Sequence, residues 1–238
     1  RKIFSLVSTF SDEFIFASEA TKSYYKSLLK RETKGYVIPS GVNTKKFDPK
    51  VKYKGDELII SKMKNKFIIG MIANISPEKG IDDFVRAASK VNAKVKDCHF
   101  LVIGRIFENQ KKYYKKIKLL SRTLNVDNIS FIGKKDDVRP LLNRFDVYLC
   151  TSKYESSPIS VWEALSMGKP IITNDVGDVS LYVKNNVNGY VVKNNIIEDL
   201  ANRLIYLNSN RDVCYKFGEK SRAVAISNLD LSFSADKH

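Results

Sequence analysis

Short apolar runs alternate with amphipathic stretches along most of the 238-residue chain. Two of the apolar runs end at Gly104 and Gly133, and between the runs the apolar residues of segments such as 82–94 recur at helical spacing. Such alternation is typical of βαβ units, whose parallel strands are covered on both faces. It predicts an α/β fold, a Rossmann-like parallel sheet of about six strands with helices on both faces.

The predicted strands are residues 67–73, 99–103, 128–132, 145–150, 170–173 and 189–192, and the predicted helices are residues 82–94, 111–124, 198–207 and 212–226. The first forty-odd residues follow a separate order. There, residues 13–18 predict a strand and turn, 19–30 a helix, and 35–39 another strand. Dense charge and frequent turn residues between 47 and 65 then indicate a domain boundary.

One segment combines a helix start with two carboxylates. Pro158 fits the first turn of a helix, where its missing N–H costs nothing, and Gly168 ends that helix. Glu155 therefore lies before the helix and Glu163 within it. Free N–H groups at residues 157–160 favour phosphate, and the two carboxylates can accept hydrogen bonds from sugar hydroxyls. The segment indicates a nucleotide-sugar site; the alternative is a solvated Glu155 and a Glu163 on the helix surface.

Four loops follow the carboxyl ends of predicted strands, at residues 74–80, 104–107, 133–136 and 152–160. Ligands of open α/β sheets bind outside these ends, so we expect the four loops to form one cleft. Lys79 joins the two glutamates at its rim.

The composition is that of a soluble globular protein, with 43% hydrophobic residues and a formal net charge of +15. The charge favours anionic partners, although solvated helix faces are the alternative explanation. We expect no nucleic acid partner, because no recognition pattern is present. An anionic membrane, contacted peripherally, stays open as a partner.

Cys98, Cys150 and Cys214 form no CxxC pattern, so neither disulfides nor zinc are indicated. The sequence has no apolar run of about 20 residues and no signal-peptide pattern. We expect a cytoplasmic protein, with peripheral association at the inner face of the membrane as an open alternative. Because the sequence begins with Arg1, we also expect a fragment of a longer chain.

Together these motifs resemble those of glycosyltransferase family 4, a group of retaining GT-B enzymes also known as glycosyl transferases group 1. The segment 37–49, VIPSGVNTKKFDP, is similar to the interdomain linker of that family. Segment 72–80, IANISPEKG, resembles its G-R-L-x-x-x-K-G loop, and segment 155–163 resembles its E-x7-E motif. Asp175-Val-Gly177 and Asn188-Gly189 also stand where the family has a late loop and turn.

The resemblance implies three parts. Residues 1–48 correspond to a remnant of the N-terminal acceptor domain and the linker, and residues 49–226 to the C-terminal, donor-binding domain of a GT-B enzyme. Residues 227–238 correspond to the start of the C-terminal crossover segment.

The resemblance also implies a role for each motif. Glu163 would bind the ribose hydroxyls, Glu155 the transferred sugar, and Lys79 the diphosphate, whose growing charge it would stabilise as an electrostatic catalyst. The loop that starts at Ile132 would contact the base. The implied binding residues are Asn74, Lys79, Ile132, Glu155, Ser157, Pro158, Ile159, Ser160 and Glu163, of which Lys79 and Glu155 are the implied catalytic residues.

Two departures from the family pattern concern this pocket. Asn74 replaces the usual Arg, with Ala73 for Gly, which leaves one phosphate contact uncharged. Arg105 is a candidate substitute, or else an ordinary surface Arg. The glycine-aromatic-glycine that usually follows the first Glu is Ser-Ser-Pro, residues 156–158, which changes the shape of the pocket.

Neither histidine is a credible catalytic base, because His99 opens a buried strand and His238 is terminal. Asp136-Asp137 is expected in a loop or helix cap rather than at a metal. The resemblance implies a metal-independent enzyme without a cofactor, whose substrate is a nucleotide-diphosphate-sugar.

The function implied is a hexosyltransferase that moves sugar to a glycan or lipid-linked acceptor with retention, as in polysaccharide biosynthesis. The fragment would lack the acceptor domain that full activity needs. Two alternatives remain: a non-catalytic sugar-nucleotide or polyanion binding module, and a nucleotide-sugar epimerase or phosphorylase of the same fold.

Overall fold

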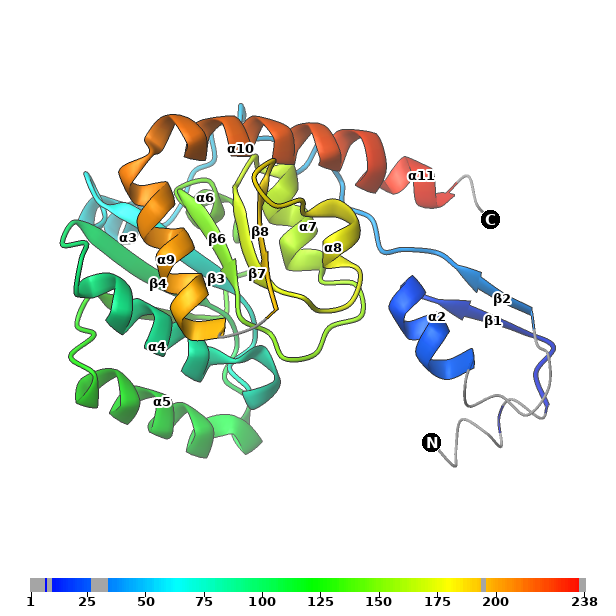
Figure 1. The fold of residues 1–238 in the computed structure, drawn as a ribbon, viewed down its shortest axis with the longest axis horizontal. Coiled ribbons are helices and arrows are strands. Elements are labelled where there is room, and N and C mark those ends of the chain that lie inside the picture. Colours follow the sequence, from blue (N-terminus) through cyan, green and yellow to red (C-terminus); the bar gives the residue numbers. More distant parts are fainter. Residues whose placement is uncertain (1–6, 8–9, 27–33, 194–195, 236–238) are drawn as a thin grey trace.

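The computed structural model describes residues 7, 10–26, 34–193 and 196–235. Its main sheet is parallel, with the strand order β5-β4-β3-β6-β7-β8, and helices cover both faces (Figure 1). The strands are β3 (Phe67–Ile72), β4 (Cys98–Ile103), β5 (Ile129–Gly133), β6 (Val147–Cys150), β7 (Ile171–Asn174) and β8 (Gly189–Val192). All six predicted strands are present, and the predicted fold class is confirmed.

Successive side chains of a strand point to opposite faces, which produces two buried clusters. In β4, Phe100 and Val102 belong to the first cluster, whereas Leu101 and Ile103 belong to the second. The first cluster is covered by α4 (Ile81–Asn92), α5 (Lys111–Thr123) and α9 (Ile196–Ser209). The second is covered by α3 (Glu57–Lys62), α6 (Arg139–Leu142), α7 (Ile159–Ser166) and α8 (Val179–Tyr182).

The chain closes with α10 (Arg211–Val224), a π-helical turn (Ala225–Leu229) and α11 (Leu231–Ala235). Cys214 and Phe217 of α10 pack in the first cluster, and Ala225 and Leu229 of the π turn pack in the second. This last part of the chain therefore contributes to both faces of the sheet. No described helix is both long and apolar enough to cross a membrane.

The sequence analysis missed α3, which lies within the charged segment 47–65. Its Ile59 and Ile60 pack against the second cluster, and the neighbouring Phe47 and Met63 are buried there. Four apolar side chains scattered among lysines give no clear period, so this contribution to the core was not visible in the pattern.

The N-terminal segment lies beside the main sheet rather than in it (Figure 1). It consists of β1 (Glu13–Phe16), α2 (Glu19–Lys26) and β2 (Lys34–Val37), and the two strands pair in parallel. The order strand, helix, strand agrees with the prediction. Residues 27–30 of the predicted helix lie outside the described residues.

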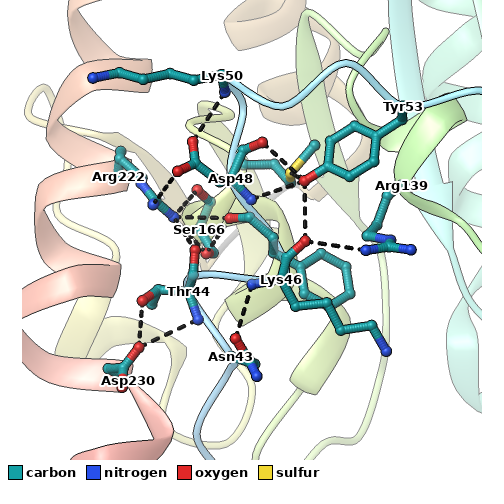
Figure 2. A network of polar contacts seen from close by, with 12 residues as sticks. Asn43, Thr44, Lys46, Asp48, Lys50, Tyr53, Arg139, Ser166, Arg222 and Asp230 are labelled. Carbon is teal, nitrogen blue, oxygen red and sulfur yellow. Dashed lines mark hydrogen bonds and ion pairs between the residues drawn. The ribbon is translucent and has the colours of Figure 1, made fainter.

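The linker that follows β2 is held by a polar network around Arg222 of α10 (Figure 2). Nη1 of Arg222 donates hydrogen bonds to the carbonyl oxygens of Thr44, Phe47 and Ser166, at 3.0, 2.8 and 2.8 Å, and to the Ser166 hydroxyl. Asp230 accepts hydrogen bonds from the Thr44 N–H and hydroxyl. The linker is thus fastened at several points to the end of the chain.

Candidate active site

The four predicted loops meet at a cleft of about 480 Å³ outside the carboxyl ends of the strands. The cleft lies where the chain order reverses, since β3, β4 and β5 follow one another in one direction and β6, β7 and β8 in the other. Such switch points are the usual ligand sites of open α/β sheets. The lining residues are Ile72, Ala73, Asn74, Lys79, Ile103, Gly104, Arg105, Lys134, Lys135, Val138, Glu155, Ser157, Pro158, Ile159 and Ser160.

Two glycines allow the loops to approach one another. Gly80 has φ of 61°, and a Cβ atom on it would lie 2.0 Å from the carbonyl oxygen of Thr151. A Cβ atom on Gly104 would lie 1.8 Å from the carbonyl oxygen of Ala73. Any other residue at either position would force the backbone apart, so both glycines are required by the shape of the cleft.

Lys79 and Glu155 form an ion pair at the cleft, although 76 positions separate them in the sequence. Lys79 Nζ donates to Glu155 Oε1 at 2.6 Å, and the Ser152 hydroxyl donates to the same oxygen at 2.8 Å. The two side chains are 28% and 15% exposed. They are therefore held in place, yet remain open to a ligand from the cleft.

Residues 157–160, at the N-terminus of α7, line the same cleft. Pro158 occupies the N-cap position, one residue earlier than the predicted first turn. Among the described residues, the N–H groups of Ile159 and Ser160 donate to no protein acceptor. Ser157 accepts a hydrogen bond from Trp162 Nε1 at 3.0 Å, and the hydroxyls of Ser160 and Tyr148 are hydrogen bonded at 2.9 Å. These contacts fix the turn and leave two donors for an anion.

Glu163 lies on α7 as predicted, but it is not among the residues that line the cleft. Burial raises the pKa of its carboxyl to about 7, and the nearby ammonium of Lys46 acts in the opposite direction. Lys46 belongs to the linker.

Ile132 also lies outside the lining. It is part of β5 rather than of a loop, and it packs partly against the second cluster. Lys134, Lys135 and Val138 line the cleft after that strand. The run Lys134-Lys135 directly after a strand end was the sequence signal for the two lysines; Val138 had none.

Asn74 and Arg105 both line the cleft, which brings the uncharged replacement and its candidate substitute together. The Arg105 guanidinium also lies 4.8 Å from the centre of the Phe107 ring. Lys135 is less free, because it forms an ion pair with Asp56. Lys134 is paired too, with Asp136. Among the described cations of the cleft lining, Arg105 is therefore the one that has no acidic partner within ion-pair distance.

The remaining candidates lie elsewhere. His99, in β4, shares a 2.9 Å hydrogen bond between Nε2 and the Ser130 hydroxyl, and burial lowers its pKa. Asp137 lies just before α6 and accepts hydrogen bonds from the N–H and side chain of Arg139, the first residue of that helix. Asp136 forms an ion pair with Lys134 at 2.8 Å. Both aspartates therefore have structural partners in a loop. Across the part of the chain that the structure describes, no group of three His, Cys, Asp or Glu side chains is placed to hold a metal.

The family model for Glycosyl transferases group 1 matches residues 57–224. The chain belongs to this family. The predicted resemblance is thereby confirmed at the level of the group, and the matched part of this group 1 chain contains the cleft and both glutamates.

Curated relatives agree with this membership. A UDP-Gal:alpha-D-GlcNAc-diphosphoundecaprenol alpha-1,3-galactosyltransferase of Escherichia coli is 28% identical over 181 residues, covering 74% of this chain and 45% of the relative. An N,N'-diacetylbacillosaminyl-diphospho-undecaprenol alpha-1,3-N-acetylgalactosaminyltransferase of Campylobacter jejuni is 28% identical over 209 residues, covering 86% and 53%. The group 1 chain thus spans about half the length of the curated relatives it matches.

Solved structures show the same fold. A glycosyltransferase from Rickettsia africae superposes with a TM-score of 0.85 at 25% identity, covering 99% of this chain and 64% of that one. HepE of Anabaena, in complex with UDP and glucose, gives a TM-score of 0.87 at 19% identity, covering 100% and 64%. The described architecture is therefore that of GT-B glycosyltransferases.

Proposed function

We propose that this chain holds the nucleotide-sugar donor site of a family 4 hexosyltransferase that retains the configuration of the transferred sugar. The observation that carries the proposal is the Lys79–Glu155 pair, placed in the cleft directly before the N-terminus of α7. A fixed cation and two free N–H groups suit a diphosphate, and the carboxylate beside them suits sugar hydroxyls.

The proposed chemistry follows from where charge develops. The acceptor hydroxyl forms the new bond to the anomeric carbon while the bond between that carbon and the diphosphate oxygen breaks. The nucleoside diphosphate leaves with additional negative charge and takes up the proton of the acceptor hydroxyl. Lys79 and the N–H groups of Ile159 and Ser160 stabilise that charge more in the transition state than in the bound substrate. Lys79 must then exchange part of its contact with Glu155 for a phosphate oxygen, while Ser152 continues to donate to Glu155. The proposed reaction uses no metal and no cofactor.

The remaining binding roles are part of the same proposal. Glu163 binds the ribose hydroxyls, whose hydrogen bonds would favour the ionised form of a carboxyl that burial keeps partly protonated near neutral pH. Asn74 donates an uncharged hydrogen bond to a phosphate, Arg105 supplies charge nearby, and Ile132 contacts the base.

The acceptor is proposed from the relatives. The names of the Escherichia coli and Campylobacter jejuni enzymes specify acceptors linked to diphosphoundecaprenol, and a Staphylococcus aureus relative is named for poly(ribitol-phosphate). We propose a lipid-linked or glycan acceptor bound by an N-terminal domain of which residues 1–48 are the tail, with residues 49–226 as donor domain and 227–238 as the start of the crossover. Contact would occur at the cytoplasmic face of an anionic membrane.

The test is a thermal-shift and calorimetric screen of the chain against UDP, GDP, ADP and their common sugars, because a ligand that binds the native state raises its apparent stability. One nucleotide should bind, and Glu163→Ala and Lys79→Ala should each weaken its binding by about 1 to 3 kcal/mol. Glu219→Ala, an exposed glutamate of α10, is the matched control.

Unchanged affinity in both site variants would overturn the assigned site. Binding of all polyanions without preference for any nucleotide would instead favour the non-catalytic binding module, for which the uncharged Asn74 is the supporting observation.

A further inference from the structure

Helix α5 presents a strongly basic face. Its thirteen residues, KKYYKKIKLLSRT, contain six cationic side chains and no acidic one. All six cations are exposed, whereas Ile117 and Ser121 are buried and the tyrosines are partly buried. Figure 1 shows α5 on the outside of the molecule, next to α4. The helix therefore packs by one side and directs all of its charge to the other.

The positions of the cations on this face are continuous. At 100° per residue, the six cations lie within an arc of about 160°, which we call the α5 basic face. It comprises Lys111, Lys112, Lys115, Lys116, Lys118 and Arg122. Lys111 pairs with Glu108 at 2.9 Å. Among the described residues, Lys112, Lys115, Lys116 and Arg122 have no acidic partner within ion-pair distance.

An apolar side chain stands in the middle of this charged arc. Leu119 is 64% exposed, and by helical spacing it lies between Lys115, Lys112 and Lys116. Phe107, 40% exposed, adds an aromatic ring just before the helix. Helices that lie in the interface of an anionic bilayer combine lysines and arginines with apolar side chains such as Leu and Phe. Leu119 and Phe107 supply apolar side chains beside the cations of α5.

The α5 basic face also continues toward the cleft. The segment that leads into α5 begins at Gly104 and Arg105, which line the cleft, and passes through Phe107 and the turn Glu108–Gln110. Lys111 and Lys112 are thus the first residues of the helix after the cleft rim. A surface held on α5 would approach the edge of the site rather than its far side.

We propose that the α5 basic face, with Leu119 and Phe107, docks the protein on an anionic phospholipid surface. Lysine and arginine side chains neutralise the headgroups, and Leu119 enters the apolar boundary. The inference deepens the proposed function, because it names the surface on which a lipid-linked acceptor would be met. The experiment that tests it measures binding of the chain to vesicles in the absence of any acceptor or sugar.

The experiment measures co-sedimentation of the chain with vesicles of phosphatidylcholine alone and of phosphatidylcholine with phosphatidylglycerol. Binding should require the anionic lipid and weaken as salt is added. A variant with Lys112, Lys115 and Lys116 all changed to Gln should bind about a hundredfold more weakly, since each cation near such a surface contributes roughly fivefold.

The matched control changes Lys94, Lys216 and Lys220 to Gln, which removes the same number of exposed cations from α10 and from the turn after α4. Both triple variants have the same net charge. The control should keep vesicle binding within a few-fold of wild type. Equal losses in the two variants would overturn the proposal, because net charge rather than the α5 basic face would then set the affinity.

A second variant tests insertion. Leu119→Trp adds an exposed fluorophore to a chain whose single native tryptophan, Trp162, is fully buried. Its emission should shift to the blue on anionic vesicles and stay unchanged on phosphatidylcholine. No shift, together with equally tight binding to double-stranded DNA, would overturn the proposal in favour of a nucleic acid partner.

Nucleotide binding separates this inference from the proposed function. The Lys112, Lys115 and Lys116 variant should keep the wild-type affinity for the nucleotide found in the screen. If the wild-type chain binds vesicles but no nucleotide, the proposed donor site is wrong and the docking surface is supported. If it binds a nucleotide but no vesicles, the proposed docking surface alone is wrong.

Discussion

Glu163 carries a carboxyl group that the fold removes partly from water. Burial raises its pKa from 4.5 to about 7, against the opposing charge of Lys46. The folded state therefore holds this proton more tightly than the unfolded chain does. The protonated Glu163 therefore contributes stability that is fully present below pH 4.5. This stability is lost as the pH rises through about 7, because the buried carboxyl must then ionise.

We predict that Glu163→Gln raises the free energy of unfolding at about pH 8 by roughly 1 to 3 kcal/mol, because each unit of pKa shift corresponds to about 1.4 kcal/mol. The difference should disappear below about pH 4.5, where the glutamate is protonated in both states. Urea denaturation at the two pH values measures it, with Glu219→Gln as the exposed control. A difference that does not change with pH would show that the carboxyl is well solvated.

At Glu155 the predicted effect is on ligand binding. In the free protein this carboxylate is ion-paired with Lys79, with 2.6 Å between Glu155 Oε1 and Lys79 Nζ. Glu155→Gln removes the negative charge and releases the ammonium, so we expect UDP without a sugar to bind about three- to tenfold more tightly. Lys79→Gln should weaken the same binding. Isothermal titration of both variants decides the matter, and weaker binding in Glu155→Gln would mean that the carboxylate orients Lys79 rather than competing with the phosphate.

Among the elements, α2 docks on the donor side of the molecule through its N-terminus. The buried carboxylate of Asp178 accepts hydrogen bonds from the N–H groups of Glu19 and Ala20, at 2.9 and 3.1 Å. The hydroxyl of Ser156, next to Glu155, lies within hydrogen-bond distance of the Ser18 and Thr21 hydroxyls. Asp178 thus acts as an N-cap supplied by a distant part of the chain.

We predict that Asp178→Ala destabilises the contact by about 1 to 2 kcal/mol, as expected for loss of a charged cap. Amide exchange of α2, residues Glu19–Lys26, should become about five- to thirtyfold faster, while α4 is unaffected. The control is Asp175→Ala in the same loop, whose carboxylate pairs with Lys193 at 3.2 Å. Equal exchange rates in the two variants would contradict a docking role for Asp178.

The elements also differ in how visible they were in the sequence. In α4 the apolar residues recur at helical spacing and all pack in the first cluster, so the helix and its buried face were predictable from spacing. In β8 the predicted and observed bounds are identical. The short helix α3 is different, because its isoleucines find their partners only in a cluster formed by distant segments.

For the whole molecule, Arg222 connects the linker to the last helices. One guanidinium nitrogen serves three carbonyl oxygens and a hydroxyl, and the other lies 3.4 Å from Asp48 (Figure 2). Tyr53 adds a second anchor, because its hydroxyl accepts from the Asp48 N–H and contacts the Lys46 carbonyl. These contacts hold the linker itself, whereas α2 before it has separate contacts with Asp178 and Ser156.

Arg222→Met should therefore lower the free energy of unfolding by about 2 to 4 kcal/mol, because among the described residues it leaves the carbonyls of Thr44 and Ser166 without a donor. Arg203→Met serves as the control, since Arg203 makes an exposed ion pair within α9 and should cost less than about 1 kcal/mol. Chemical denaturation compares the two. A loss no larger than that of the control would show that the linker is held by its apolar residues alone.

The site was predictable in part. The positions of Lys79, Glu155 and the start of α7 followed from motifs and from the rule that strand ends meet at one edge. The direct pairing of Lys79 with Glu155, the position of Glu163 and Ile132 outside the cleft lining, and the contribution of Val138 did not follow. Each depends on how separate loops fold against one another.

The sequence by itself determined the α/β class, the six strands, the helices with a single apolar face and the family, because these depend on local periodicity and short motifs. Only the tertiary structure decided what lies between segments far apart in the chain. It joined Lys79 to Glu155, partly buried Glu163 near Lys46, placed Asp178 at the start of α2 and fastened the linker to Arg222. Hydrogen bonds and desolvation depend on separations of a few ångströms, which spacing along the sequence does not specify.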